Sequence, residues 1–274
     1  MEFSVLISVY GKDDIDFFKI ALESVTVKQS LKPTQVVIVE DGPVSEKVDE
    51  IIAETQILVP AIEFTVVKKE KNAGLAAALN SGLKVCKYDW VARMDSDDIS
   101  VPTRFELQMD YLKKHPEVAA AGGTIAEFET EVGDIDSERH IKLQHSEIEI
   151  MAQSRTPMNH VSVVFSKKAV DSVGGYSEDF GKLEDYKLWV DLISTGKTLG
   201  NIDDILVYVR VGNGFIERRS NKREIQDWDM LQRYLLKNQL IGNRKAILNR
   251  IYIRAFIYMP AWIKKIAYKL FLRG

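Results

Sequence analysis

Alternating strand and helix patterns over the first hundred residues constrain the fold of this chain more than any other feature. Continuous apolar runs at residues 3–9, 35–39, 64–67 and 90–92 are typical of strands buried on both faces of a sheet. Between them, residues 16–29, 45–55 and 74–85 carry apolar side chains at helical spacing. Strands that alternate with helices pair in parallel through right-handed crossovers. We therefore predict an α/β fold with a mostly parallel sheet flanked by helices.

Carboxylates follow two of these predicted strands. Asp41 comes after the second strand, and Asp95, Asp97 and Asp98 come directly after the fourth. In an open α/β sheet, ligands bind beyond the carboxyl ends of the strands. Neighbouring carboxylates repel one another unless water or a cation screens them, and Mg²⁺ and Mn²⁺ prefer oxygen ligands. The pattern predicts a divalent metal site in a crevice that Asp41 also faces; the alternative is a solvated acidic turn.

The second half of the chain has a less regular pattern. We predict a pair of strands over 118–128 around Gly122-Gly123, further strands at 161–165 and 206–211, and helices at 145–153, 186–194 and 224–238. No Gly-x-Gly-x-x-Gly follows the first strand and no Walker lysine loop is present, which argues against the usual dinucleotide and P-loop sites. The single cysteine, Cys86, excludes an intrachain disulfide and fits a reducing compartment.

Six motifs, taken in order, resemble those of family 2 glycosyltransferases, the inverting enzymes with the GT-A fold. They are VLISVYGK, VVIVEDGP, NAGLAAALNSGL, ARMDSDDISVPTR, GGY and LEDYKLW, within residues 3 to 211. The fourth is close to the pattern of bacterial capsule and O-antigen transferases. The resemblance implies a Rossmann-like GT-A catalytic domain over 1–211, in which 1–100 bind the nucleotide and 101–211 bind the acceptor. It also implies a UDP-linked sugar donor, a lipid-linked saccharide acceptor, Mn²⁺ or Mg²⁺, and a role in bacterial surface polysaccharide synthesis.

Residues on the donor side are identified from the resemblance, position by position. Asp41 corresponds to the carboxylate that holds the nucleotide base, because a carboxylate accepts the imide N–H of uracil. Val9 and Tyr10 line the same pocket. Asn72 and Gly74, in the third motif, are expected to contact the nucleotide sugar, and Asn72 can also cap the helix that follows.

The fourth and sixth motifs supply the metal ligands and the base. Asp95 and Asp97 match the Asp-x-Asp of the family: one contacts the ribose or the metal, and the other ligates the metal. Asp98 is expected to cap the following helix. Asp185 matches the catalytic base, which deprotonates the acceptor hydroxyl, and Glu184 orients it. Adjacent helical side chains diverge by about 100°, so only one of this pair can point at the acceptor.

One position departs from the family pattern. Many relatives carry an arginine before the asparagine of the third motif, and here Leu79 precedes Asn80. The missing phosphate contact is expected from Arg93, or from Arg218 and Arg219 in a mobile loop over 212–222 that closes over the diphosphate. His160, before a predicted strand, either lines the acceptor site, reaches the metal, or is structural.

The C-terminal part, 223–274, is predicted to be a basic, amphipathic helical appendage. Residues 242–274 contain eight bases and no acids. Because the whole chain has a net charge of −3, residues 1–241 carry a net charge of −11. Such helices bind anionic membrane surfaces, and the alternative is packing on the catalytic domain. Pro260 divides the segment into pieces too short to span a bilayer. The acidic N-terminus lacks the basic region of a signal peptide, so we expect a cytoplasmic protein on the inner face of the membrane.

Nucleic acid is not an expected partner, since the catalytic part is acidic. Two other interpretations of these motifs are possible. A sugar nucleotidyltransferase also places paired carboxylates on an α/β sheet, but the segment SVYGKDD lacks its Gly-rich loop. A catalytically inactive membrane scaffold with the same fold would not need both Asp97 and Asp185. The sequence leaves the donor sugar, the acceptor, the linkage position and the oligomeric state undetermined.

Overall fold

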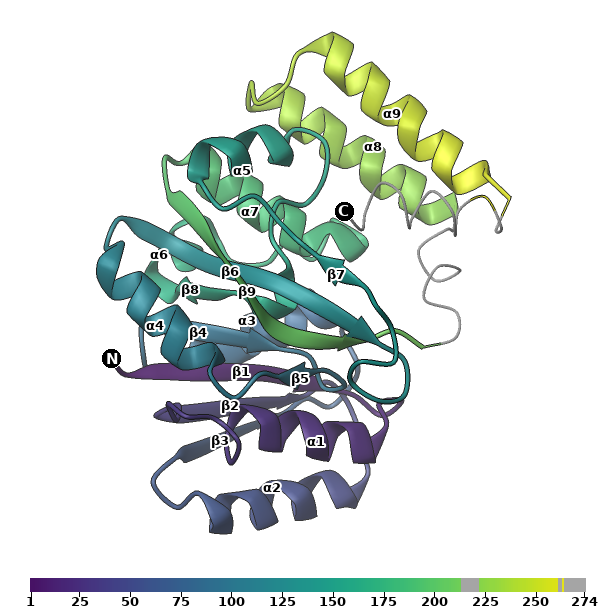
Figure 1. Cartoon of the computed structure of the whole chain (residues 1–274). Helices are drawn as coiled ribbons and strands as arrows, with labels where there is room; N and C mark the ends of the chain where they lie inside the picture. The colour runs from purple at the N-terminus through teal and green to yellow at the C-terminus, as the bar shows by residue number, and fades with distance from the viewer. Residues whose placement is uncertain (213–221, 261–262, 264–274) are drawn as a thin grey trace.

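The computed structural model describes residues 1–212, 222–260 and 263 (Figure 1). Within them a nine-stranded sheet has the order β3-β2-β1-β4-β8-β6-β9-β5, and β7 pairs with β6. Helices cover both faces of the sheet, and α8 and α9 lie at the end of the molecule farthest from α2 (Figure 1). This arrangement confirms the predicted α/β fold with C-terminal helices.

The N-terminal half is the parallel part of the sheet. β1 (Phe3–Val9) pairs in parallel with β2 (Gln35–Glu40) and β4 (Trp90–Met94), and β2 pairs with β3 (Glu63–Lys68). The connecting helices are α1 (Ile15–Val25), α2 (Glu46–Leu58) and α3 (Leu75–Val85). All four strands therefore end at the same edge, where the sequence predicts ligand binding.

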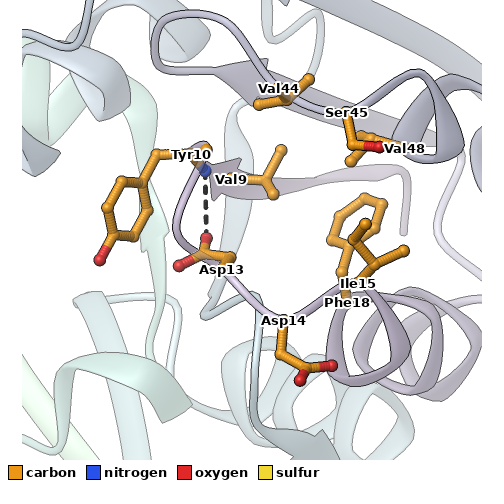
Figure 2. Close-up of a pocket in the computed structure, with 10 residues that line it drawn as sticks. Val9, Tyr10, Asp13, Asp14, Ile15, Phe18, Val44, Ser45 and Val48 are labelled. Atoms are coloured by element: carbon orange, nitrogen blue, oxygen red, sulfur yellow. Dashed lines mark hydrogen bonds between the residues drawn. The ribbon is translucent and has the colours of Figure 1, made fainter.

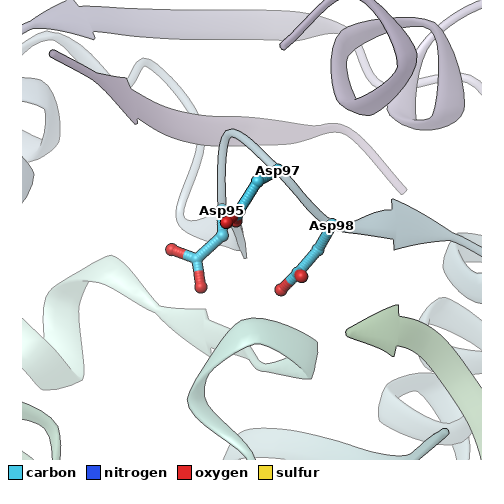
Figure 3. A group of neighbouring side chains, drawn as sticks. All are labelled: Asp95, Asp97 and Asp98. Carbon is cyan, nitrogen blue, oxygen red and sulfur yellow. The ribbon is translucent and has the colours of Figure 1, made fainter. Parts of the chain in front are cut away.

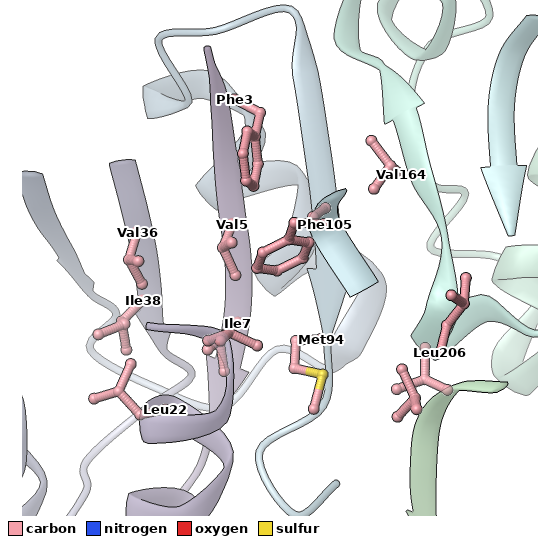
Figure 4. Close-up of a cluster of buried hydrophobic side chains, with 14 of the residues drawn as sticks. Phe3, Val5, Ile7, Leu22, Val36, Ile38, Met94, Phe105, Val164 and Leu206 are labelled. Atoms are coloured by element: carbon pink, nitrogen blue, oxygen red, sulfur yellow. The ribbon is translucent and has the colours of Figure 1, made fainter. Parts of the chain in front are cut away.

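Two apolar layers hold the helices against the sheet. On one face, α1, α2 and α4 (Arg104–Lys114) pack on alternate residues of the strands, with Phe105 against Phe3 (Figure 4). On the other face lie α3, α5 (His145–Ala152), α6 (Lys167–Ser172) and α7 (Glu184–Ser194). α3 approaches β1 closely at Gly82, where a Cβ would lie 2.3 Å from Leu6 Cδ1. A side chain at this position would push the helix off the sheet.

The second half contains antiparallel pairs. β6 (Val118–Phe128) is one continuous strand, so the predicted pair of strands around Gly122-Gly123 is wrong. These glycines allow close packing rather than a turn, because a Cβ on Gly123 would lie 2.3 Å from Leu206 Cδ1. β6 pairs in parallel with β9 (Thr198–Arg210) and antiparallel with β8 (Val164–Ser166), and β8 pairs antiparallel with β4. β5 (Ile99–Ser100) pairs with β9, and β7 (Glu138–Arg139) with β6.

The C-terminal helices build a third apolar cluster. α8 (Lys222–Lys237) and α9 (Asn243–Tyr258) pack together and on α7 through side chains that include Leu231, Leu235 and Ala246. Asn249 Nδ2 donates to Gln153 O at 2.7 Å, which joins α9 to the end of α5. In the part of the chain that the structure describes, no helix is long and apolar enough to cross a membrane.

Candidate active site

The three aspartates after β4 form a compact acidic cluster (Figure 3). Carboxylate oxygens of Asp95, Asp97 and Asp98 lie within 4.8 Å of one another. The end of β9 holds this loop, because Arg210 N donates to Asp98 Oδ1 at 2.8 Å and Arg210 Nε donates to Asp97 O at 3.1 Å. The Arg210 guanidinium in turn lies over the ring of Phe17, 3.7 Å from its centroid. The cluster is therefore fixed by tertiary contacts rather than by its own loop alone.

The expectation that Asp98 caps the following helix is wrong. Its side chain is buried and accepts a hydrogen bond from the backbone N–H of Arg210 in β9. Burial, followed by repulsion from Asp95 and Asp97, raises the Asp98 pKa well above its usual value. Burial and repulsion from Asp95 and Asp13 raise the pKa of Asp97, whose side chain reaches the surface, to about 6. Carboxylates that repel one another in a fixed loop are the hard oxygen donors that Mg²⁺ or Mn²⁺ takes, so the cluster fits such an ion.

A small pocket of about 40 Å³ opens beside the end of β1 (Figure 2). Val9 and Tyr10 line it, together with Asp13, whose Oδ2 accepts from Tyr10 N at 3.1 Å. The same oxygen accepts from Ser96 Oγ at 2.7 Å. Asp41, which was expected to share a pocket with Val9 and Tyr10, is not among the residues that line this one. Asp13 links the small pocket to the acidic cluster, a role that the sequence analysis missed because Asp13 lies in a polar stretch with no motif of its own.

Asp41 lies at the end of β2, where its carboxylate holds the loop before α3. Its two oxygens accept from Ala73 N at 3.0 Å and Gly74 N at 2.9 Å, and Lys69 Nζ lies 2.8 Å away. The expectation that Asn72 caps α3 is wrong: Asn72 is exposed, and Gly74 occupies the cap position with φ of 90°. The roles of Asp41, Asn72 and Gly74 toward a nucleotide stay predictions.

A larger cavity of about 500 Å³ brings most of the other predicted residues together. Its lining includes Arg93, Asp95, His160, Glu184 and Asp185. The C-terminal helices close one side of it with Trp228 of α8 and with two residues of α9, Ile253 and Phe256. The sequence did not indicate this wall, since it arises from the packing of helices distant along the chain.

The acidic pair stands at the start of α7, after the 3₁₀ turn η2 (Gly181–Leu183). Burial is the main cause that raises the pKa of Glu184 to about 7, and repulsion from Asp185 is the second. Burial also raises the Asp185 pKa, and Arg139 opposes this shift. Thr156 Oγ1 lies 3.3 Å from Asp185 Oδ2 and orients that carboxylate. The pair therefore binds a proton more readily than ordinary carboxylates do. A raised pKa of this kind suits a group that accepts a proton near neutral pH.

Arg93 and His160 belong to one buried network in this cavity. Arg93 Nη2 pairs with Asp95 Oδ1, while its buried Nε has no hydrogen-bond partner among the described residues. His160, in the 3₁₀ turn η1 (His160–Ser162), has Nε2 2.8 Å from the Tyr176 hydroxyl. Burial and the Arg93 charge lower the His160 pKa well below its usual value, so the imidazole is neutral. Within the described residues, His160 is not part of the acidic cluster.

Residues of the third and fifth motifs hold Tyr176, the partner of His160, in place. Asn80 Nδ2 donates to Tyr176 O at 2.8 Å, and Tyr176 N donates to Asn80 Oδ1 at 2.9 Å. Leu79 is fully buried in the core and offers no phosphate contact. The other expected sources of that contact, Arg218 and Arg219, lie outside the described residues, as does most of the predicted loop 212–222.

Comparison with solved structures matches this fold. The chain resembles the S. aureus TarS crystal structure, with a TM-score of 0.69, 15% identity and coverage of 99% of this chain and 75% of that one. A mannosyltransferase from Pyrobaculum calidifontis, solved with GDP-Man and Mn²⁺, gives a TM-score of 0.63 at 15% identity, over 97% of this chain and 72% of that one. The fold is therefore that of GT-A glycosyltransferases.

Sequence comparison shows the family. The model of glycosyl transferase family 2 matches residues 4–173, so the chain belongs to this family and is a glycosyltransferase. The amylovoran biosynthesis glycosyltransferase AmsE of Erwinia amylovora is 36% identical over 97% of this chain and 98% of its own. An Escherichia coli UDP-Gal:alpha-D-GlcNAc-diphosphoundecaprenol beta-1,3-galactosyltransferase is 32% identical, covering 99% and 97%. An uncharacterized glycosyltransferase of Haemophilus influenzae is 39% identical over 100% of both chains.

Proposed function

We propose that this enzyme transfers a sugar from a UDP-linked donor to a lipid-linked saccharide, with inversion, in the synthesis of a bacterial surface polysaccharide. One observation carries the proposal: Asp95 of the acidic cluster and Asp185 of α7 line the same cavity. A donor diphosphate at the first and an acceptor hydroxyl at the second would meet across that space. The names of the Erwinia and E. coli relatives support the polysaccharide, the UDP donor and the lipid-linked acceptor.

In this proposal Asp95, Asp97 and Asp98 hold one divalent ion, Mn²⁺ or Mg²⁺. The Mn²⁺ complex of the Pyrobaculum mannosyltransferase supports such an ion. When bound, the ion stabilises negative charge on the leaving nucleoside diphosphate. The buried Arg93, which has a free Nε donor and faces the same cavity, is suited to contact the donor in place of the arginine that Leu79 replaces. Val9, Tyr10, Asp41, Asn72 and Gly74 bind the nucleotide.

Asp185 acts as the general base. Its carboxylate takes the proton of the acceptor hydroxyl while the hydroxyl oxygen attacks the anomeric carbon. The bond from that carbon to the phosphate oxygen breaks, and the nucleoside diphosphate leaves with the bonding electrons. Attack opposite the leaving group inverts the anomeric centre. Thr156 and Arg139 orient Asp185 and stabilise its charge, and Glu184 tunes the pKa of the pair.

Nucleotide release from a donor panel tests the proposed activity. The protein is incubated with UDP-linked hexoses and N-acetylhexosamines in Mn²⁺, and free UDP is measured. One donor is expected to turn over, slowly by hydrolysis and faster with a lipid-diphosphate-linked sugar. A sugar nucleotidyltransferase would instead need a nucleoside triphosphate and a sugar phosphate, and an inactive scaffold would release nothing from any donor.

We propose that α9 binds the enzyme to a membrane surface. Its outer side exposes Ile247 at 56% and, one helical turn further on, Ile251 at 57% and Tyr252 at 71%. Arg244 and Lys245 are exposed at its start, whereas Arg250 and Arg254 pair with Asp229 of α8 and are not available to lipid. A basic start and an exposed apolar side suit the interface of an anionic bilayer. We place the enzyme on the inner face of the cytoplasmic membrane.

Replacement of Ile247 and Ile251 by Ser is expected to abolish co-sedimentation with anionic vesicles at low salt, because the apolar anchor is lost while the buried side of α9 is kept. Truncation is a poorer test, since α9 lines the cavity. The matched control replaces Ile57 and Leu58 of α2, which are 78% and 63% exposed, and should leave vesicle binding unchanged. Intact protein that ignores such vesicles would contradict the membrane assignment.

A further inference from the structure

The charges that line the large cavity are unevenly paired. The lining contains seven carboxylates and four bases, the bases being Arg93, Arg139, Arg155 and Lys182. Three of the bases face a carboxylate: Arg93 pairs with Asp95, Lys182 Nζ lies 3.5 Å from Glu224 Oε1, and Arg139 stabilises the charge of Asp185. The Arg155 side chain forms no ion pair and no hydrogen bond with any residue that the structure describes. Arg155 is half-buried, and no described residue neutralises the charge of its guanidinium.

Arg155 lies where the cavity meets α9. It follows α5 by three residues, and two residues before it the carbonyl of Gln153 accepts the hydrogen bond from Asn249 of α9. Ile253 and Phe256, one and two turns beyond Asn249, line the same cavity. This part of the wall therefore combines one unpaired cation with the apolar inner side of a helix. A ligand that satisfies both has an anionic group joined to an apolar chain.

We propose that Arg155 binds the diphosphate of a lipid-linked acceptor, and that the first carbons of the lipid lie against Ile253 and Phe256. This inference rests on the proposed function and names the part of the acceptor that this wall recognises. The planar guanidinium forms two parallel hydrogen bonds with phosphate oxygens. Away from the acidic cluster and Arg93, the lining charges are mostly carboxylates, so an unpaired base is the group best suited to hold an anion at this end of the cavity.

The same wall separates the cavity from the outer side of α9. Ile251 and Tyr252, the two residues before Ile253, are exposed on that outer side. A lipid that leaves the cavity past α9 would reach the side of the helix that we assign to the membrane. The sugar of such an acceptor would extend from Arg155 toward Asp185, whose orienting residue Thr156 is the next residue in the chain.

Binding of octyl diphosphate, measured by calorimetry with UDP and Mn²⁺ at saturation, tests this assignment. Saturating UDP occupies the donor site, so the probe reports on a second anion site. Arg155→Gln is expected to weaken binding about 10- to 100-fold, the range for a charged hydrogen-bonded contact. Arg233→Gln, which removes the same charge from an exposed position on α8, should leave it unchanged. Equal affinity of wild type and Arg155→Gln, or no binding by wild type, would overturn the proposal.

Steady-state kinetics separate this inference from the proposed function. With a short-chain sugar diphosphate as acceptor, Arg155→Gln should raise the acceptor KM about 10- to 100-fold and leave the donor KM unchanged, and Arg155→Lys should recover part of the loss. An alkyl glycoside without phosphate should react equally well with both proteins. A raised donor KM would assign Arg155 to the donor instead. If wild-type enzyme releases no UDP from any donor, the proposed function itself fails, whereas octyl diphosphate binding can still succeed.

Discussion

Asp185→Asn is expected to lower the rate of sugar transfer by about 10²- to 10⁴-fold, the usual contribution of a general base. The amide keeps the shape and the contact with Thr156 but cannot accept the acceptor proton. UDP binding in Mn²⁺ should stay close to that of wild type, because the acidic cluster is unchanged. Initial rates at saturating donor and acceptor measure the effect.

Two variants serve as controls for this result. Asp179→Asn replaces an exposed acid upstream of α7 that does not line the cavity, and should retain activity. Glu184→Gln should retain most of the activity at high pH, where Asp185 is ionised. An inactive Glu184→Gln protein beside an active Asp185→Asn protein would reverse the assignment of the base.

The rate of transfer is expected to rise with pH through about 7. Burial and repulsion raise the pKa of Glu184 to about 7, so below that pH the pair holds a proton that the base must lose. Glu184→Gln should move this inflection to lower pH, since the repelling charge is gone. A raised folded-state pKa means that Glu184 contributes stability below its unfolded value of about 4.5 that is lost as the pH rises through about 7. The urea midpoint of Glu184→Gln should therefore exceed that of wild type at pH 8.

Asp97→Asn is expected to lower donor turnover by about 10³-fold, as is removal of the ion by EDTA. A divalent ion contributes several kcal/mol to stabilisation of the leaving diphosphate, and each 1.36 kcal/mol is about tenfold in rate. The variant should fold, because Asp97 reaches the surface and its replacement removes repulsion within the cluster. UDP binding by calorimetry should no longer depend on Mn²⁺.

The control for this variant is Asp110→Asn, which removes an exposed carboxylate paired with Lys113 on α4. Its activity should match that of wild type. Full turnover by wild-type enzyme in EDTA, restored by no added metal, would exclude the ion from the mechanism. Loss of activity in Asp97→Asn together with unchanged Mn²⁺-dependent UDP binding would assign Asp97 to a different step.

Apolar periodicity and short motifs predicted the individual strands and helices of this fold and the residues at their ends. Strand β1 and helix α3 follow from apolar periodicity, and the positions of Asp95 and Asp185 follow from motifs at the ends of elements. The glycine pair in β6 misled because a glycine permits both a turn and a close approach, and here Leu206 packs against it. Sequence spacing does not distinguish the two.

The rest of the site depends on contacts between distant segments. Arg210 fixes the acidic cluster from the end of β9, and Asp13 joins that cluster to the loop after β1. Neither residue lies at a position that periodicity singles out. The wall formed by Trp228 and Phe256 requires α8 and α9 to pack over α7, an arrangement that an amphipathic pattern alone leaves open between a protein and a membrane surface.

The configuration of the new glycosidic bond tests the central claim most directly. Once the donor is known, the product formed from its α-linked UDP-sugar is examined by NMR, and the coupling constant of the anomeric proton is measured. An acceptor hydroxyl deprotonated by Asp185, opposite the leaving diphosphate, gives a β-linked product. An α-linked product would show that configuration is retained, and would contradict the role assigned to Asp185 and to the cavity it lines.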